Sequence, residues 1–296
     1  MDYLTKLSPP TKSFHKYSGA GNDFILIDHR MDELTVVSPT HIRALCDRYE
    51  GVGADGVIFL INSKIADCQM RIFNADGIEA SMCGNGLRCL AKFFREVAAF
   101  TGSTCWIETP LDPTLKLHEC RFLENQIKTQ LGPPVNVLFN QQLEVERHSF
   151  VYDFMDNGVR HVVLFFDDID TLNVDTLGEK IMRHPNFAPQ MTNVNFVCYR
   201  GDNTLVVRTY EKGVNRETLA CGTGAMASAH AAKIHYSLEF PIYVFPKSGQ
   251  RLEIENNWLT GPAKKVFAGE FPSNELQCAK LWKKKNQKSI QKLKTL

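Results

Sequence analysis

The sequence has no apolar run that approaches the about 20 residues of a membrane-spanning helix. It also has no excess of one charge, because 34 basic residues stand against 33 acidic ones and the formal net charge is +1. We therefore expect no membrane segment, and no partnership with nucleic acid or an anionic membrane. The first ten residues, MDYLTKLSPP, contain no apolar core, so no secretory signal is expected there.

A cysteine framework is absent as well. The nine cysteines are an odd number, spread over 296 residues without the spacing of a disulfide-stapled domain. The sequence has no Cys-x-x-Cys redox pair, and Cys83 and Cys89 lack the partner pair that a zinc site needs. We expect reduced thiols, a cytoplasmic location and no metal site.

The composition is that of a globular protein of about two domains, with 44% hydrophobic and 23% charged residues. Short runs rich in β-branched and aromatic residues end at turn-forming residues, which predicts strands. These strands cover 24–27, 57–61, 70–73, 162–166, 194–197 and 205–207, and helices are predicted over 39–49, 87–99, 171–183 and 225–235. Strands and helices do not alternate regularly, which favours an α+β fold with mostly antiparallel sheets over a doubly wound parallel sheet.

A weak internal repeat divides the chain near its middle. Residues 82–86 read Met-Cys-Gly-Asn-Gly, and residues 220–224 read Ala-Cys-Gly-Thr-Gly. Each copy follows a strand that ends in polar residues and precedes a helix rich in small or apolar side chains. The matched flanks predict a duplicated fold whose halves meet near Pro133 and Pro134, with one site between two lobes.

Each repeat places a cysteine, Cys83 or Cys221, in a glycine-rich turn just before a helix. The first amides of a helix lack internal partners and carry partial positive charge. We therefore expect them to lower the pKa of the thiol and to bind a carboxylate. Two opposed thiols suit the inversion of a carbon, because one removes a proton and the other returns one on the opposite face. The helix amides would stabilise the carbanion, so neither a metal nor pyridoxal is needed.

Other interpretations of the motifs explain less. A cysteine hydrolase would use one thiol and a base such as His161, which leaves the second Cys-Gly-x-Gly segment unexplained. Residues 51–56, Gly-Val-Gly-Ala-Asp-Gly, match the dinucleotide fingerprint G-x-G-x-x-G. That fingerprint must follow a strand and open a helix, whereas here a predicted helix precedes it and a strand follows. We expect a tight helix-to-strand turn instead.

Several segments together carry a resemblance to a known family. They are YSGAGNDF at 17–24, GVGADG at 51–56, FNADG at 73–77, MCGNGLRC at 82–89, GVRH at 158–161, TNVNF at 192–196, YEKG at 210–213 and ETLACGTGA at 217–225. In this order they resemble the diaminopimelate epimerases, cofactor-independent enzymes that interconvert LL- and meso-diaminopimelate. The matches extend over about residues 14 to 270.

The resemblance implies two pseudosymmetric lobes, each a mostly antiparallel sheet wrapped around a central helix. Residues 1–130 would form the first lobe, joined by a returning strand at about 264–275, and residues 131–263 the second. A basic tail at 277–296 lies outside the resemblance. The resemblance also implies a small diamino dicarboxylate substrate, no cofactor, a homodimer, and a place in lysine and peptidoglycan precursor biosynthesis.

Residue by residue, the resemblance makes Cys83 and Cys221 the two catalytic bases, with Cys83 serving the L configuration and Cys221 the D. His161 and Glu211 match polar groups that tune the ionisation of the thiols. The expected substrate-binding residues are Asn22, Asn74, Gly84, Asn85, Asn193, Glu211, Lys212, Gly222 and Thr223. The alternatives are that the asparagines only form turns and that His161 is a buried structural histidine.

Two positions depart from the family pattern. Lys212 stands where the family usually has arginine, and lysine lacks the two-pronged grip of a guanidinium on a carboxylate. Arg160 stands where the family has proline, and we hypothesise that it supplies the missing grip. Three alternatives stay open: a racemase of this fold for another amino acid such as glutamate, a non-catalytic binding protein, and a redox sensor whose two thiols form a disulfide.

Overall fold

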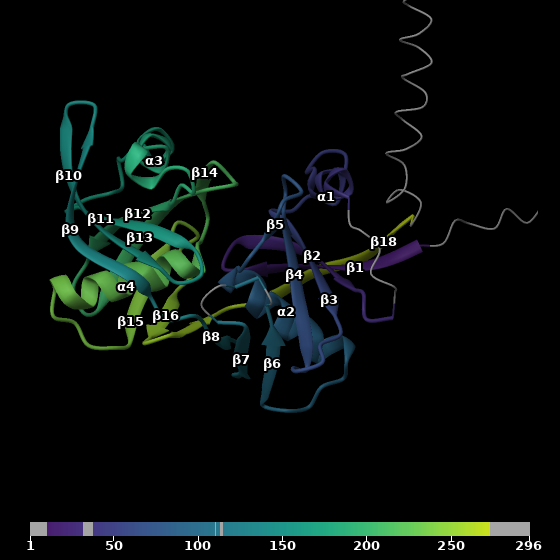
Figure 1. Cartoon of the computed structure of the whole chain (residues 1–296). Helices are drawn as coiled ribbons and strands as arrows, with labels where there is room; N and C mark the ends of the chain where they lie inside the picture. The colour runs from purple at the N-terminus through teal and green to yellow at the C-terminus, as the bar shows by residue number, and fades with distance from the viewer. Residues whose placement is uncertain (1–10, 32–37, 110, 113–114, 273–296) are drawn as a thin grey trace, which may run out of the picture.

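The 18 strands in the described part of the chain form one continuous hydrogen-bonded sheet that curves separately in each half of the chain, and the two halves lie side by side (Figure 1). The computed structural model describes residues 11–31, 38–109, 111–112 and 115–272. Each lobe wraps its sheet around one central helix, so the expected α+β fold with two pseudosymmetric lobes is confirmed.

The first lobe carries the central helix α2 and a second helix, α1, on its outside. Its elements are β1 (Thr11–Gly19), β2 (Asn22–Asp28), α1 (Pro39–Cys46), β3 (Gly56–Ile61), β4 (Cys68–Asn74), β5 (Glu79–Ala80), α2 (Gly84–Val97), β6 (Thr104–Glu108), β7 (Leu117–Phe122) and β8 (Ile127–Gln130). Neighbouring strands pair antiparallel except for β2 with β3 and β4 with β6, each of which is joined across a helix.

The second lobe repeats this plan with α4 at its centre and α3 outside. Its elements are β9 (Val135–Val145), β10 (His148–Asp156), β11 (Arg160–Phe165), α3 (Val174–Met182), a 3₁₀ turn (Pro185–Phe187), β12 (Asn193–Tyr199), β13 (Thr204–Glu211), β14 (Arg216–Thr218), α4 (Gly222–His235), β15 (Ile242–Pro246), β16 (Leu252–Glu255) and β17 (Trp258–Gly261). Its parallel pairs, β11 with β12 and β13 with β15, stand at the places that β2–β3 and β4–β6 occupy in the first lobe. The duplicated fold predicted from the two Cys-Gly-x-Gly segments is therefore present in the strand order.

Two connections join the lobes. Strand β18 (Lys264–Pro272) returns from the second half and pairs antiparallel with β1, as the expected returning strand does (Figure 1). Strands β8 and β17 pair across the lobes, and one apolar core includes side chains from both α2 and α4. We propose the lobe boundary between β8 and β9, near residue 131. The expected tail at 277–296 lies outside the described residues.

The two central helices begin three residues earlier than predicted, at Gly84 and Gly222 instead of at residues 87 and 225. The glycines are therefore part of the first helical turn. Close packing explains why they are glycines: a Cβ on Gly86 would lie 2.9 Å from Ile58 Cδ1, and one on Gly224 would lie 2.3 Å from Asn195 Oδ1. The prediction that a glycine-rich turn precedes each helix is therefore wrong. The cysteines themselves are the N-cap residues, and the glycines after them are already helical.

The outer helices also differ at their ends. Helix α1 ends at Cys46 instead of residue 49, and α3 begins at Val174 because the Asn173 side chain caps it by accepting from the amide of Thr176. Residues 51–56 form the expected turn between α1 and β3, where a Cβ on Gly51 would lie 2.0 Å from the Ala44 oxygen. Among the described residues no helix is long and apolar enough to cross a membrane.

Candidate active site

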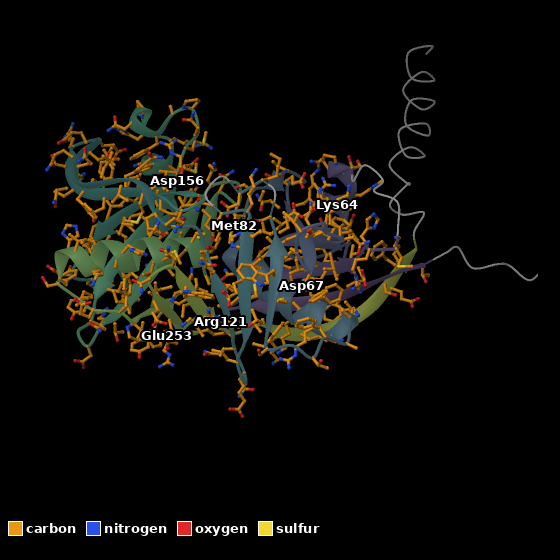
Figure 2. The ribbon with its side chains drawn as sticks, turned by 60° about the horizontal axis from the view of Figure 1, so that its bottom comes forward. Lys64, Asp67, Met82, Arg121, Asp156 and Glu253 are labelled. Atoms are coloured by element: carbon orange, nitrogen blue, oxygen red, sulfur yellow. The ribbon has the colours of Figure 1, made fainter. Side chains whose placement is uncertain are left out.

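A cleft of about 610 Å³ opens between the lobes. Both predicted thiols, Cys83 and Cys221, line it, together with all nine predicted substrate-binding residues. Met82 and Asp156, labelled in Figure 2, also line this cleft from the first and the second lobe. His161 is the one predicted site residue that is fully buried and does not line the cleft.

The thiols occupy equivalent positions at the N-termini of α2 and α4. Cys83 Sγ accepts from the amide of Gly86 at 3.4 Å, and Cys221 Sγ accepts from the amide of Gly224 at 3.4 Å. The helix ends face each other closely, since a Cβ on Gly84 would lie 3.8 Å from Gly222 Cα. The first residues of both helices line the same cleft, and helix N-termini of this kind are suited to binding an anion.

The pKa values of both thiols are raised, whereas the sequence predicted lowered values. Burial raises the pKa of the Cys83 thiol to about 11, although the Gly86 amide favours the thiolate. Burial, with the nearby Glu211, also raises the pKa of Cys221. The prediction of lowered pKa values is wrong, because burial disfavours the thiolates more than the helix ends stabilise them.

Glu211, at the end of β13, contacts the second thiol. Its carboxylate accepts from the hydroxyl of Thr218 and from the thiol of Cys221. Burial, reinforced by the charge of Asp55, raises the pKa of Glu211 to about 7. A carboxyl group with this pKa next to a thiol can exchange a proton with it near neutral pH.

His161 stands one layer behind the cleft on β11. Burial, with the charge of Lys212, lowers its pKa to about 3, so the ring is neutral. Asn195 donates its amide to His161 Nδ1 at 3.1 Å and to the Val162 oxygen, so Nδ1 accepts and Nε2 carries the hydrogen. Among the described residues, His161 Nε2 has no hydrogen-bond partner.

The predicted asparagines have different partners. Asn22 donates to Asp55 and Asn193 accepts from the amide of Lys212 at 2.8 Å, so both side chains are fixed at the cleft. Asn74 also closes a turn, because its backbone oxygen accepts from the amide of Gly77. Turn formation and a place in the cleft are thus combined at Asn74.

The two departures from the family pattern meet at one end of the cleft. Lys212 Nζ donates to the backbone oxygen of Gln190 at 3.1 Å, and Arg160 donates to the Gln190 side-chain oxygen at 3.3 Å. Arg160 also lies over the ring of Phe154, with its guanidinium carbon 5.1 Å from the ring centroid. Two cations therefore flank the same glutamine and face the cleft.

The lining residues that the sequence did not predict include three polar ones that contact predicted site residues: Asp55, Gln190 and Thr218. Asp55 lies within the Gly-Val-Gly-Ala-Asp-Gly segment, which carries part of the family resemblance and was predicted to form a tight turn, but no site role was assigned to its aspartate. Thr218 lies three residues before Cys221, a spacing that could have marked it. Gln190 carried no sequence signal, because it belongs to an irregular segment and reaches the cleft only through the fold.

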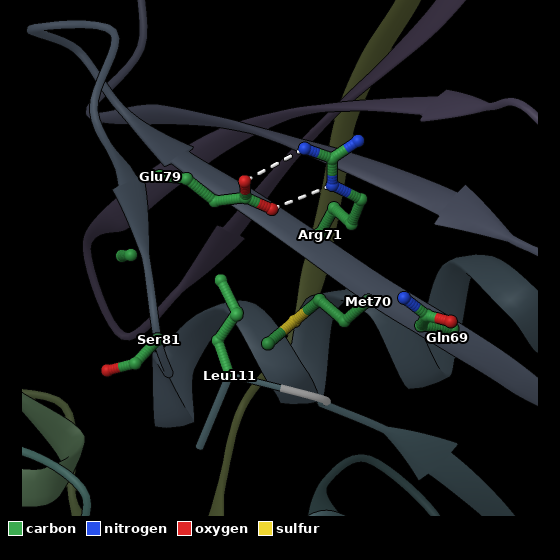
Figure 3. A pocket seen from close by; sticks show the side chains of 7 residues that line it. Gln69, Met70, Arg71, Glu79, Ser81 and Leu111 are labelled. Atoms are coloured by element: carbon green, nitrogen blue, oxygen red, sulfur yellow. Dashed lines mark hydrogen bonds and ion pairs between the residues drawn. The ribbon is translucent and has the colours of Figure 1, made fainter. Parts of the chain in front are cut away.

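A smaller pocket of about 220 Å³ lies beside the cleft and shares residues 79–81 with it (Figure 3). Its one cation, Arg71, forms a two-pronged ion pair with Glu79, with N–O distances of 2.7 and 2.8 Å. The charges of Arg71 and Glu79 neutralise each other, so Arg71 is not available to bind a substrate carboxylate. The large cleft, with two helix N-termini and two thiols, is the better candidate site.

Comparison with solved structures identifies the class of fold. A hydroxyproline epimerase from Agrobacterium vitis superimposes with a TM-score of 0.70 at 12% identity, covering 92% of this chain and 94% of that one. A PhzF-family phenazine biosynthesis protein from Bacillus anthracis gives 0.66 at 16% identity, covering 88% and 99%. At such identities the likeness concerns the fold alone, a two-lobed α+β architecture.

Sequence comparison is more specific. The family model described as diaminopimelate epimerase matches residues 14–137 and 154–266. Diaminopimelate epimerases from Synechocystis sp. and Synechococcus sp. (strain JA-3-3Ab) are 37% and 38% identical over 282 and 283 residues. These alignments cover 87% and 88% of this chain and 98% of each relative. The chain belongs to the diaminopimelate epimerase family and is an isomerase, which confirms the resemblance seen in its motifs.

Proposed function

We propose that this chain converts LL-diaminopimelate into meso-diaminopimelate with Cys83 and Cys221 as its two acid–base groups. The observation that carries the proposal is the pair of equivalent thiols, each capping a central helix and both lining one cleft. The names of the relatives support diaminopimelate as the substrate. From the family resemblance we also propose a role in the synthesis of lysine and peptidoglycan precursors.

In this mechanism the reacting carboxylate binds between the helix N-termini. The backbone amides of Gly84, Asn85, Gly222 and Thr223 hold it and stabilise the charge that spreads into it when the α-proton leaves. One sulfur, as thiolate, takes the α-proton, and the other, as thiol, gives its proton to the opposite face of the carbon. Each turnover exchanges the protonation states of Cys83 and Cys221.

Formation of the thiolate has to overcome the raised pKa values. At Cys221, which is the base in the reverse direction, the proton passes to Glu211, whose pKa of about 7 makes it a suitable acceptor. The substrate contributes a positive ammonium group, and a cation close to a thiolate lowers the thiol pKa. We propose Asn22, Asn74, Asn193 and Glu211 as the residues that hold the ammonium and distal groups, and neutral His161 as a group that tunes the thiols from behind.

The distal carboxylate binds at the end of the cleft where Arg160 and Lys212 flank Gln190. A guanidinium can grip a carboxylate with two hydrogen bonds, so Arg160 replaces the arginine that is absent at position 212. Two cations beside Gln190 in the lining of the cleft favour a dicarboxylate over a monocarboxylate. A racemase for another amino acid, such as glutamate, is the second candidate, because Lys212 departs from the family pattern.

Proton exchange in deuterated water tests the function directly. We would incubate the reduced protein with LL-diaminopimelate and, separately, with single amino acids that include glutamate and proline. Deuterium is expected at the α-carbon of diaminopimelate, with inversion lost in Cys83→Ala and in Cys221→Ala. Exchange with another amino acid alone would transfer the mechanism to that substrate. Binding without any exchange would leave a binding protein, and the proposed activity would be wrong.

Two further proposals concern the setting of the enzyme. All eight cysteines among the described residues are free thiols, which supports a reducing, cytoplasmic location. A homodimer is proposed from the family resemblance, and a mass measurement in solution distinguishes it from a monomer. A monomer that epimerises at the full rate would show that the dimer is not needed.

A further inference from the structure

A chain of hydrogen bonds runs behind Cys83 from one charged residue to another. Arg88 Nη2 donates to Asn85 Oδ1 at 2.8 Å, and Asn85 Nδ2 donates to Asn22 Oδ1 at 3.4 Å. Asn22 Nδ2 then donates to Asp55 Oδ2 at 2.8 Å. The four residues come from α2, from β2 and from the turn before β3, so the chain exists only in the folded lobe.

The two ends determine the direction of every bond in this chain. Arginine can only donate hydrogen bonds and an ionised carboxylate can only accept them. Asn85 must therefore turn its oxygen to Arg88, and its amide nitrogen also reaches the Ala220 oxygen at 2.9 Å. Asn22 must turn its nitrogen to Asp55, so its oxygen faces Cys83 Sγ at 3.8 Å.

Both ends are held firmly. Arg88 is fully buried and also donates to the backbone oxygens of Gly84 and Pro262, each at 3.3 Å. Asp55 Oδ1 binds Arg48 at 2.9 Å and, from the second lobe, Arg216 at 3.3 Å. Both arginines bind Oδ1, whereas Oδ2 accepts from Asn22 and, at 3.3 Å, from the backbone amide of Asp23.

We propose that Asp55 and Arg88 are positioning residues that lock the Asn22 oxygen toward Cys83. A neighbouring acceptor favours the protonated thiol and disfavours the thiolate. The thiol form of Cys83 is thus favoured, whereas Cys221 has Glu211 beside it to take its proton. Cys83 has to lose its own proton before it can act as the base for an L centre. The acid–base role of Cys83 rests on the proposed function, but the orientation of Asn22 does not.

The test is the variant Asp55→Asn, read by alkylation of individual cysteines without substrate. In the variant the two arginines at Oδ1 outweigh the single backbone amide of Asp23 at Oδ2, so the remaining oxygen stays with the arginines. An NH2 group then faces Asn22 and forces its amide to turn. Asn22 then presents a donor to Cys83, which stabilises the thiolate, the form that reacts with iodoacetamide. We expect the alkylation of Cys83, followed by peptide mass spectrometry, to accelerate about tenfold while Cys221 changes less than about twofold.

Two further variants make the result specific. Asp153→Asn, which removes a buried carboxylate paired with His235 away from the cleft, is the matched control and should leave both rates unchanged. Asn22→Asp keeps an acceptor beside Cys83 and adds charge, so it should slow the alkylation of Cys83. If Asp55→Asn does not fold, Asn22→Asp still tests the proposal.

The proposal is overturned if folded Asp55→Asn alkylates Cys83 at the wild-type rate. It is also overturned if Cys83 and Cys221 accelerate together, because that pattern means a loosened cleft, or if Asn22→Asp accelerates Cys83. Alkylation requires no substrate, so a failure of the proposed epimerisation in the exchange experiment leaves this result interpretable. Conversely, an active enzyme with unchanged thiol reactivity in Asp55→Asn would refute only the positioning role.

Discussion

Replacing Glu211 with glutamine probes the electrostatics of the cleft through folding stability alone. Burial, together with Asp55, raises the pKa of Glu211 from 4.5 to about 7. Since one pKa unit corresponds to about 1.4 kcal/mol, ionisation of Glu211 in the folded protein costs roughly 3 kcal/mol. The side chain is partly open to the cleft, and solvent screening reduces this figure to about 2 kcal/mol.

The direction follows from the raised pKa. Below pH 4.5 the carboxyl group is protonated in the folded and the unfolded chain, so its contribution to stability is fully present. As the pH rises through about 7, the folded chain has to accommodate the charge and this stability is lost. Glu211→Gln has no such charge, so the variant should gain about 2 kcal/mol relative to wild type between about pH 5 and about pH 8.

Urea unfolding of both proteins at the two pH values measures this difference. Glu217→Gln is a matched control with the opposite sign: burial opposes ionisation there, but hydrogen bonds from Arg208 and Lys247 prevail and lower the pKa of Glu217. Its contribution is present above its unfolded pKa, so that variant should lose stability at about pH 8. A stability difference between wild type and Glu211→Gln that is the same at both pH values would refute the reasoning.

Three other predictions concern the substrate, the core and the thiols. Arg160→Ala should raise KM for diaminopimelate about tenfold with a smaller change in kcat, because a distal carboxylate loses its two-pronged partner; steady-state kinetics with an unchanged KM would remove this role. Gly178→Ala should destabilise the protein by about 2 kcal/mol in thermal unfolding, because its Cβ would lie 2.4 Å from Tyr210 Cβ, and a wild-type Tm would contradict that packing. Prolonged oxidation should abolish activity and dithiothreitol restore it, through a disulfide between Cys83 and Cys221 that peptide mapping detects; full activity after oxidation would count against close approach of the thiols.

Much of the architecture could be predicted because it depends on local or repeated features. The runs around residues 57–61 and 194–197 are apolar and β-branched, and both are buried strands. The paired Cys-Gly-x-Gly segments indicated a duplication that the strand order bears out. Helix ends were predicted less well, because the first turns at Gly84 and Gly222 depend on side chains of the surrounding sheet.

The candidate site could be predicted as a set of residues but not as an electrostatic environment. Every residue expected to bind substrate lines the cleft, since the motifs carry those residue types in order. The raised pKa of Cys83 was not foreseen, because dehydration depends on which segments cover the thiol. Asp55 was overlooked for a similar reason, because its carboxylate contacts Asn22 and Arg216 only in the folded chain.

The sequence by itself determined the family, the duplicated plan and the identity of the two thiols, because these depend on residue types at fixed spacings. Only the tertiary structure decided how closely the helix ends at Cys83 and Cys221 approach, that burial raises the pKa of both thiols, and that Glu211 lies beside one of them. Burial and charge are properties of the neighbours that surround an atom. For Cys83 and Cys221 those neighbours come from both halves of the chain, and only folding brings them together.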